Sequence, residues 1–272
     1  MENTKNAIEE PTSAEAYVDR GNAFYDQGDY QAAHSDYDEA IRINPEYAGA
    51  YHNRGNAKDE LGDFEGAISD YDEAIRLNPE YRDAYNNRGN AKSSLGKHFE
   101  ALSDYDMAIR LDPNDAKVYH NRGNAKLRLE HPEAAIPDYD EAIRINPDDA
   151  GTYSNRGVAK SRIGKHFEAL SDYDEAIRIN PKDAEAYNNR GNAKLRLEHP
   201  EAAIPDYDEA IRLNPEYANA YYNRGNAKEE LGDLEGAISD YNEALRIDPN
   251  NETARTNRED AQRELREREK ET

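Results

Sequence analysis

The sequence contains no cysteine, which excludes disulfide bonds, thiolate zinc sites and cysteine nucleophiles. No apolar run is long enough to span a bilayer, and the first residues lack the basic and then apolar pattern of a signal peptide. Positive charge is scarce, since 35 lysines and arginines stand against 58 aspartates and glutamates and give a formal net charge of −23. Such an acidic surface repels phosphate groups, so neither nucleic acid nor an anionic membrane is expected as a partner. We expect a cytoplasmic protein.

A period of 34 residues runs through the chain and divides it into repeats, whose positions we number from 1 to 34. Seven repeats begin at residues 14, 48, 82, 116, 150, 184 and 218. A fixed period of this length indicates a solenoid, in which each repeat packs only against its neighbours. The repeats therefore occupy residues 14–251, after a polar lead-in at residues 1–13. Residues 252–272 are predicted to form a capping helix with a charged tail, because Arg255 and Glu259 replace an aromatic residue and a glycine of the repeat.

Each repeat predicts two helices, at about positions 2 to 14 and 18 to 30. In the second repeat, Gly62 ends the first helix and Asn78-Pro79 ends the second. Gly55 lies in mid-helix, where glycine costs about 1 kcal/mol relative to alanine. We therefore expect the two helices to approach closely at Gly55, Ala67 and Ala74. The fold class is all-α.

The repeat resembles the tetratricopeptide repeat, whose signature has aromatic residues at positions 4 and 24, glycine at 8, alanine at 20 and 27, and proline at 32. The second repeat carries this signature as Tyr51, Gly55, Ala67, Tyr71, Ala74 and Pro79. The resemblance covers residues 14–251 and implies a right-handed α-solenoid of seven helix-turn-helix units plus the cap. Two positions depart from the family pattern: position 7 is arginine throughout, and position 11 is lysine in six repeats.

The arginine at position 7 lies in an apolar helical stripe, so its guanidinium needs a partner. Aspartate stands at position 23 of every repeat, and we predict internal pairs between the two positions. Three of the predicted pairs are Arg54 with Asp70, Arg88 with Asp104, and Arg122 with Asp138. The alternative is an anion site built from the arginines. Asp72, Glu73 and Arg76, by contrast, are expected to form a solvated helix face.

Asparagine is a poor helix former, yet it recurs at positions 6 and 9 of the first helix. In tetratricopeptide arrays these positions face a concave groove, where an amide can bond a peptide backbone. The candidate groove residues are Asn53, Asn56, Asn87, Asn90, Asn121, Asn124, Asn155, Asn189, Asn192, Asn223 and Asn226. Val158 interrupts the series. The alternative is that asparagine is only an inherited polar residue. If it binds peptide, alanine at Asn87, Asn121 and Asn189 should abolish binding and leave the fold intact.

Selectivity is expected from the variable neighbours of these asparagines, namely His52, His120, Arg128, Arg162, Arg196 and Tyr222. The arginines make the middle of the groove basic, which favours acidic ligand residues there. The dicarboxylate clamp of chaperone-binding relatives is missing, because position 5 carries no lysine. No catalytic arrangement, phosphate loop or paired histidines are found, so we expect no enzyme, cofactor or metal.

The function predicted is a protein-interaction module that binds an extended peptide or a partner helix, as a monomer or with weak end-to-end association. A structural spacer, an engineered scaffold without a ligand, and an array separated from an enzyme remain alternatives. The partner's identity and the chain's natural or engineered origin stay open. One local feature is also predicted: Pro137 and Pro205 lie five residues after another proline, so each should kink its helix or delay its start.

Overall fold

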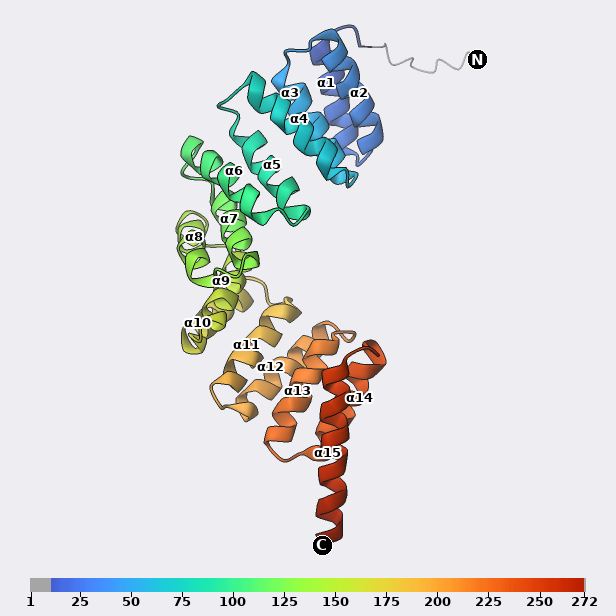
Figure 1. Cartoon of the computed structure of the whole chain (residues 1–272), viewed down its shortest axis with the longest axis vertical. Coiled ribbons are helices and arrows are strands. Elements are labelled where there is room, and N and C mark those ends of the chain that lie inside the picture. Colours follow the sequence, from blue (N-terminus) through green and yellow to red (C-terminus); the bar gives the residue numbers. More distant parts are fainter. Residues whose placement is uncertain (1–10, 272) are drawn as a thin grey trace, which may run out of the picture. The chain divides into compact units, whose positions relative to one another are not determined.

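The computed structural model describes residues 11–271, in which there are fifteen α-helices and no strand. The chain forms two compact units that divide after His131. Consecutive helices pack against one another within each unit, the arrangement of an α-solenoid (Figure 1). The N-terminal unit contains α1 (Ala14–Asp26), α2 (Tyr30–Ile43), α3 (Ala48–Glu60), α4 (Phe64–Leu77), α5 (Arg82–Ser94), α6 (His98–Leu111) and α7 (Ala116–Arg128).

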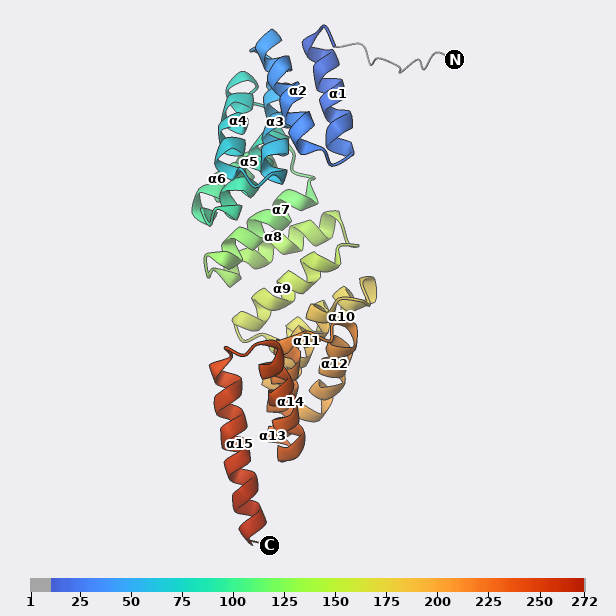
Figure 2. The same cartoon turned by 90° about the vertical axis from the view of Figure 1, so that its right-hand side faces the viewer.

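The C-terminal unit ends in a helix longer than its neighbours. It contains α8 (Pro132–Ile145), α9 (Ala150–Arg162), α10 (His166–Ile179), α11 (Ala184–Arg196), α12 (Pro200–Leu213), α13 (Ala218–Glu230), α14 (Leu234–Ile247) and α15 (Glu252–Glu271). Ala261 and Leu265 of α15 pack on the apolar cluster around Tyr241. The C-terminal half of α15 extends past α13 and α14 (Figure 2).

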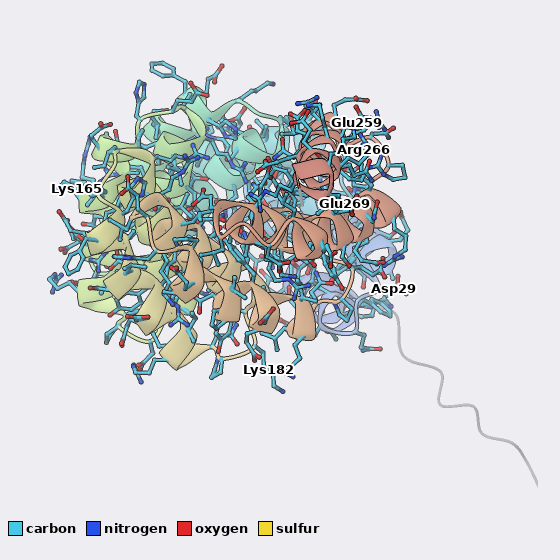
Figure 3. The ribbon with its side chains drawn as sticks, turned by 90° about the horizontal axis from the view of Figure 1, so that it is seen from below. Asp29, Lys165, Lys182, Glu259, Arg266 and Glu269 are labelled. Atoms are coloured by element: carbon cyan, nitrogen blue, oxygen red, sulfur yellow. The ribbon has the colours of Figure 1, made fainter. Side chains whose placement is uncertain are left out.

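Charged side chains cover the outside of the C-terminal unit. Lys165, Lys182 and Glu269 are exposed, and Lys165 and Lys182 lie at the rim of the view in Figure 3. Among residues 11–271, no helix combines the length and the apolar character needed to cross a membrane. The first ten residues of the predicted lead-in and Thr272 lie outside the described residues.

Specific polar residues fix the helix ends. The Asp63 carboxylate accepts a hydrogen bond of 3.0 Å from the Gly66 N–H at the start of α4, which satisfies a donor that has no partner within the helix. At the other end, Asn78 leaves the helical conformation before Pro79, and its side chain accepts from the Glu80 N–H at 3.1 Å. These contacts set the phase of the repeat.

The turn between the two helices of a repeat needs a left-handed residue at position 15. Five repeats have glycine there with φ between +74° and +81°, at Gly28, Gly62, Gly96, Gly164 and Gly232. The other two have Glu130 and Glu198 with φ of 60° and 63°. A side chain in this conformation costs about 1–2 kcal/mol.

We expect Glu198→Gly to raise the free energy of unfolding by about 1 kcal/mol, because glycine adopts this conformation without steric cost. Gly164→Ala is the matched control and should lower it by a similar amount, since alanine is strained at positive φ. Urea denaturation followed by circular dichroism measures both changes. A Glu198→Gly protein that is less stable than the parent contradicts the prediction.

Gly55 marks a close approach between helices, as predicted, but the group that approaches it is an aromatic ring. A Cβ placed on Gly55 would lie 2.6 Å from Cε1 of Tyr71, and the next two atoms also belong to this ring. Ala67 and Ala74 are fully buried beside it. The tyrosine at position 24 therefore explains the glycine at position 8.

The prediction of a delayed start at Pro137 and Pro205 is wrong. The helices α8 and α12 begin at Pro132 and Pro200, the same repeat position at which α4 begins, and both run on through the second proline. Pro200 occupies the first turn of α12, where the missing N–H has no partner in any helix. The other form of the prediction, a local kink at the second proline, stays a prediction.

Candidate functional site

The buried carboxylate at position 23 binds two cationic side chains of its own repeat. Arg54 donates to the two oxygens of Asp70, from Nε at 2.9 Å and from Nη2 at 2.5 Å. Lys58 Nζ lies 2.8 Å from Asp70 Oδ2. Arginine at position 7 and lysine at position 11, the two departures from the family pattern, thus share one partner. Burial lowers the pKa of Arg54, but the hydrogen bonds that it donates to Asp70 and Asp38, and the negative charge of these two residues, outweigh burial and raise the pKa above its usual value.

The same arginine reaches the preceding repeat. Arg54 Nη1 donates to Asp38 Oδ1 at 2.5 Å, and Arg88 Nη1 donates to Asp72 Oδ1 at 2.6 Å. Asp72 therefore belongs to a contact between repeats, although the sequence suggested only a solvated face. Glu73 and Arg76 do form an exposed pair at 2.6 Å.

These contacts recur in both compact units. Arg88 donates to Asp104, and in the C-terminal unit Arg156, Arg190 and Arg224 donate to buried aspartates of their own repeats at 2.6 Å, namely Asp172, Asp206 and Asp240. Of the third predicted pair, Arg122 lies in the N-terminal unit and donates to Asp106 at 2.7 Å. Asp138 is a buried residue of the C-terminal unit. The arginines are thus committed to aspartates, which leaves little to support the anion-site alternative.

The asparagines form a ladder with the buried tyrosines. The Tyr71 hydroxyl donates to Asn56 Oδ1 at 2.9 Å, and Asn87 of the next repeat donates to the same oxygen from Nδ2 at 2.9 Å. Burial raises the pKa of Tyr71, so its hydroxyl keeps its proton. The same three-residue contact links Tyr105, Asn90 and Asn121, and also Tyr37, Asn22 and Asn53. The side-chain oxygen of the asparagine at position 9 therefore accepts hydrogen bonds from within the protein, and its amide hydrogens remain available to donate.

This ladder argues against the expectation that alanine at Asn87 and Asn121 leaves the fold intact, because each donates a bond between repeats. His52 belongs to the same network. It is only 8% exposed, with Nδ1 at 3.1 Å from Asn53 Oδ1 and Nε2 at 3.2 Å from Asn87 Nδ2. Burial lowers its pKa, and a neutral ring protonated on Nδ1 satisfies both contacts. We therefore leave His52 out of the proposed ligand contacts.

Val158 breaks the ladder. It stands at position 9, where the other repeats have asparagine, so the following Asn189 has no oxygen to which it can donate. Asn189 accepts a long bond of 3.5 Å from Asn188, but its Nδ2 makes no hydrogen bond to the residues that the structure describes. Its neighbour Asn192 accepts from the Tyr207 hydroxyl at 2.9 Å and likewise donates to none of these residues. Two amide groups are therefore free to donate next to each other.

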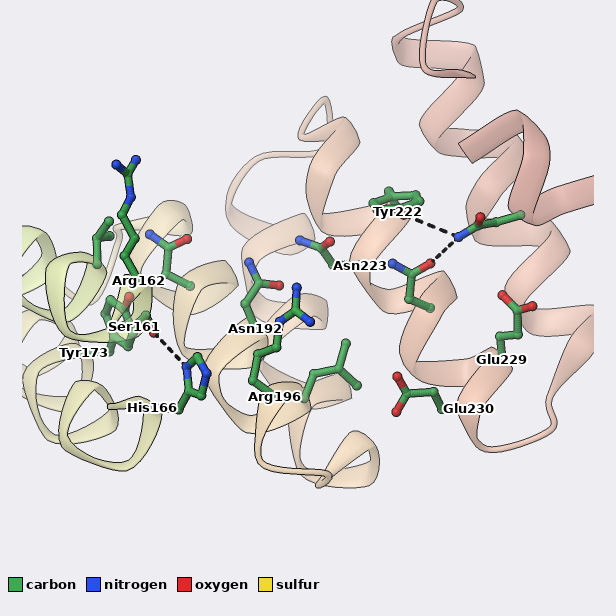
Figure 4. A pocket seen from close by; sticks show the side chains of 15 residues that line it. Ser161, Arg162, His166, Tyr173, Asn192, Arg196, Tyr222, Asn223, Glu229 and Glu230 are labelled. Atoms are coloured by element: carbon green, nitrogen blue, oxygen red, sulfur yellow. Dashed lines mark hydrogen bonds between the residues drawn. The ribbon is translucent and has the colours of Figure 1, made fainter. Parts of the chain in front are cut away.

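These amides line an open pocket in the C-terminal unit, with a cavity volume of about 660 Å³, which we call the C-terminal pocket. Figure 4 shows side chains from successive first helices converging on it. Seven of the predicted site residues line it: Asn189, Asn192, Asn223, Asn226, Arg162, Arg196 and Tyr222. Val158, Ser161, His166, Tyr173, Leu195, Glu229, Glu230 and Asn257 complete the lining and were not among the predicted site residues.

A smaller pocket of about 200 Å³ lies in the N-terminal unit. It brings together the predicted residues Asn56, Asn87 and Asn90 and is acidic, because Asp59 and Glu60 also line it. Asp59 Oδ1 is buried without a hydrogen-bond partner. Its burial, and secondarily the charge of Glu60, raise the pKa of Asp59.

The remaining predicted residues lie on first helices outside the residues that define these two pockets. Asn53 is on α3, His120, Asn121, Asn124 and Arg128 are on α7, and Asn155 is on α9. Arg128 is exposed, and the others are partly buried. The lining residues that sequence reasoning missed carried one signal: Ser161, Leu195 and Glu229 share position 12, which faces the groove in tetratricopeptide arrays.

Three family models match the chain. The one described as TPR repeat matches residues 21–58, 60–96, 89–129 and 162–197. Two described as tetratricopeptide repeat match residues 116–149 and 188–252. No curated protein sequence matches.

Solved structures share the fold. A tetratricopeptide repeat protein from Parabacteroides merdae is 21% identical with a TM-score of 0.67, over 92% of this chain and 98% of its own. YrrB, described as a TPR protein with an unusual peptide-binding site, is 27% identical with a TM-score of 0.59, over 68% of this chain and 95% of its own. MamA is 25% identical with a TM-score of 0.58, over 63% and 93%. Since the TPR repeat model alone matches more than half of the residues, the chain belongs to the tetratricopeptide repeat family.

Proposed function

We propose that this chain is a protein-interaction module that binds an extended peptide along the first helices of its tetratricopeptide repeats, without catalysis. The boundaries we propose are residues 1–13 for the lead-in, 14–251 for the repeats and 252–272 for the cap. The observation that carries the proposal is the C-terminal pocket, where the amide groups of Asn189 and Asn192 have no acceptor among residues 11–271. YrrB, a relative by fold and 27% identical, is described as having a peptide-binding site, which supports it.

The hydrogen bonds available in the groove favour a peptide backbone. The carbonyl oxygen at position 9 is occupied by a tyrosine hydroxyl, as at Asn192 with Tyr207, so the free groups are donors. A peptide in extended conformation presents carbonyl oxygens in two directions along its length and has no internal bonds to lose. Amide donors spaced along the first helices can therefore bind such a segment without reading its side chains.

The test uses Asn189, because its free amide separates binding from stability. Asn189→Ala should weaken binding of the full chain to a random peptide library by about fivefold, as expected for one lost hydrogen bond. Asn189→Asp should weaken it at least as much, because a carboxylate repels peptide carbonyl oxygens. Neither change should lower the unfolding midpoint.

The matched control is the asparagine at the same repeat position where the ladder is intact, Asn87. Asn87→Ala should cost about 1 kcal/mol of stability, because Asn87 donates to Asn56. A chain that binds no peptide saturably, or that binds equally well after both changes at Asn189, would instead favour the spacer or scaffold.

A further inference from the structure

The C-terminal pocket carries opposite charges at its two ends. Arg162 on α9 and Arg196 on α11 are exposed and occupy position 13 of consecutive repeats. Glu229 and Glu230 on α13 lie at the other end (Figure 4). Charge along the pocket therefore changes from positive to negative within three first helices.

Two of these four charges, Arg196 and Glu230, are available to a ligand. Arg196 and Glu230 make no ion pair with the residues that the structure describes, in contrast to the position-7 arginines Arg190 and Arg224, which are paired with aspartate. Glu229 is held in place, since its Oε2 lies 2.5 Å from the Tyr241 hydroxyl. A ligand can therefore neutralise both ends without breaking an ion pair of Arg196 or Glu230.

The wall between the two ends is suited to a peptide. Val158, Leu195 and Tyr222 supply apolar surface, and the free amide of Asn189 lies among them in the lining. The helix α11 contacts both α9 and α13. Neighbouring helices lie about 8–10 Å apart, which corresponds to about three residues of extended chain. About six residues therefore separate the first helix from the third, and a peptide of about nine residues covers all three.

We infer that the C-terminal pocket selects a bipolar peptide, an extended segment with acidic side chains against Arg162 and Arg196 and a basic side chain against Glu229 and Glu230, about three residues further on. This inference rests on the proposed function and refines it. A uniformly acidic ligand, which the arginines alone would favour, places a like charge against the two glutamates. A uniformly basic ligand has the same conflict at the arginines.

The experiment compares pooled peptides of about nine residues with random uncharged positions and a charged residue at about every third position. One pool is bipolar, one carries only glutamate and one carries only lysine at those positions. Binding to the full chain is measured by fluorescence anisotropy at low and at high salt. We expect the bipolar pool to bind about tenfold more tightly than either uniform pool at low salt, and the difference to shrink as salt screens the charges.

Two variants test which end of the pocket binds which charge of the peptide. Arg196→Ala should weaken binding of the bipolar pool by about fivefold, so that this pool no longer binds more tightly than the lysine pool. Glu230→Gln should remove the advantage of the bipolar pool over the glutamate pool. Arg212→Ala and Glu209→Gln are the controls, since they neutralise an exposed pair on α12 in the same unit.

The outcomes separate this inference from the function beneath it. Tightest binding by the glutamate pool, or binding of the bipolar pool that is indifferent to Arg196 and Glu230, overturns the bipolar ligand. If Asn189→Ala still weakens every pool in that case, peptide binding stands. If no pool binds saturably, both proposals are wrong.

Discussion

Asp206→Ala is expected to lower the free energy of unfolding by about 3–5 kcal/mol, the usual cost of removing one partner from a buried ion pair. The Asp206 carboxylate is 5% exposed and accepts from Arg190 Nη2 at 2.6 Å and from Lys194 Nζ at 2.7 Å. Without it, two partly buried cations lose their counter-ion together. Denaturant unfolding measures the total loss, and hydrogen exchange should show it concentrated in α11 and α12, because repeats depend on their nearest neighbours.

The control changes the other partner of the same arginine. Asp174 accepts from Arg190 Nη1 at 2.7 Å but is 62% exposed. Asp174→Ala should therefore cost at most about 1 kcal/mol. Equal losses in the two variants would contradict the assignment of Asp206 as the structural partner.

Gly55→Ala should destabilise the N-terminal unit, although alanine is the better helix former by about 1 kcal/mol. The added Cβ would lie 2.6 Å from the Tyr71 ring, in a helix pair whose alanines Ala67 and Ala74 are fully buried. Overpacking of this kind costs about 1–3 kcal/mol, so we expect a net loss of up to about 2 kcal/mol in urea denaturation.

A double variant tests the cause. Tyr71→Leu removes the ring carbons that the new Cβ would meet, so Gly55→Ala should cost much less in that background than in the parent. Simple additivity of the two losses would mean that the glycine is required for another reason.

The fold was predictable because the same sequence signals recur at the same positions of every repeat. Helix ends such as Gly62 and Asn78-Pro79 recur in fixed phase, and the observed helices end within a residue or so of the predicted limits. Arg54 and Asp70 could be matched because each recurs in every repeat. A helical stripe also indicates which residues share a face.

The candidate site was less predictable, because it depends on which side chains of one helix contact side chains of another. Nothing in the sequence states that the Tyr71 hydroxyl reaches Asn56, so the asparagines were assigned to a ligand rather than to one another. The burial of His52 follows from the ring of Tyr81, because the two ring centroids lie 4.7 Å apart. Tyr81 belongs to the loop before the next repeat. Val158 was visible as an exception, but the free amide of Asn189 appears only when the neighbouring ladder is known.

Five of the arginines at position 7, namely Arg54, Arg88, Arg156, Arg190 and Arg224, each bind two carboxylates, and we expect these contacts to respond to salt. Arg54 binds Asp70, which is 5% exposed, and Asp38 of the preceding repeat, which is 47% exposed. Dissolved ions screen exposed charges far more than buried ones. Rising ionic strength therefore softens the joints between neighbouring repeats while each repeat keeps its internal pair. We expect the amplitude of bending within a unit to increase with salt before any helix unfolds.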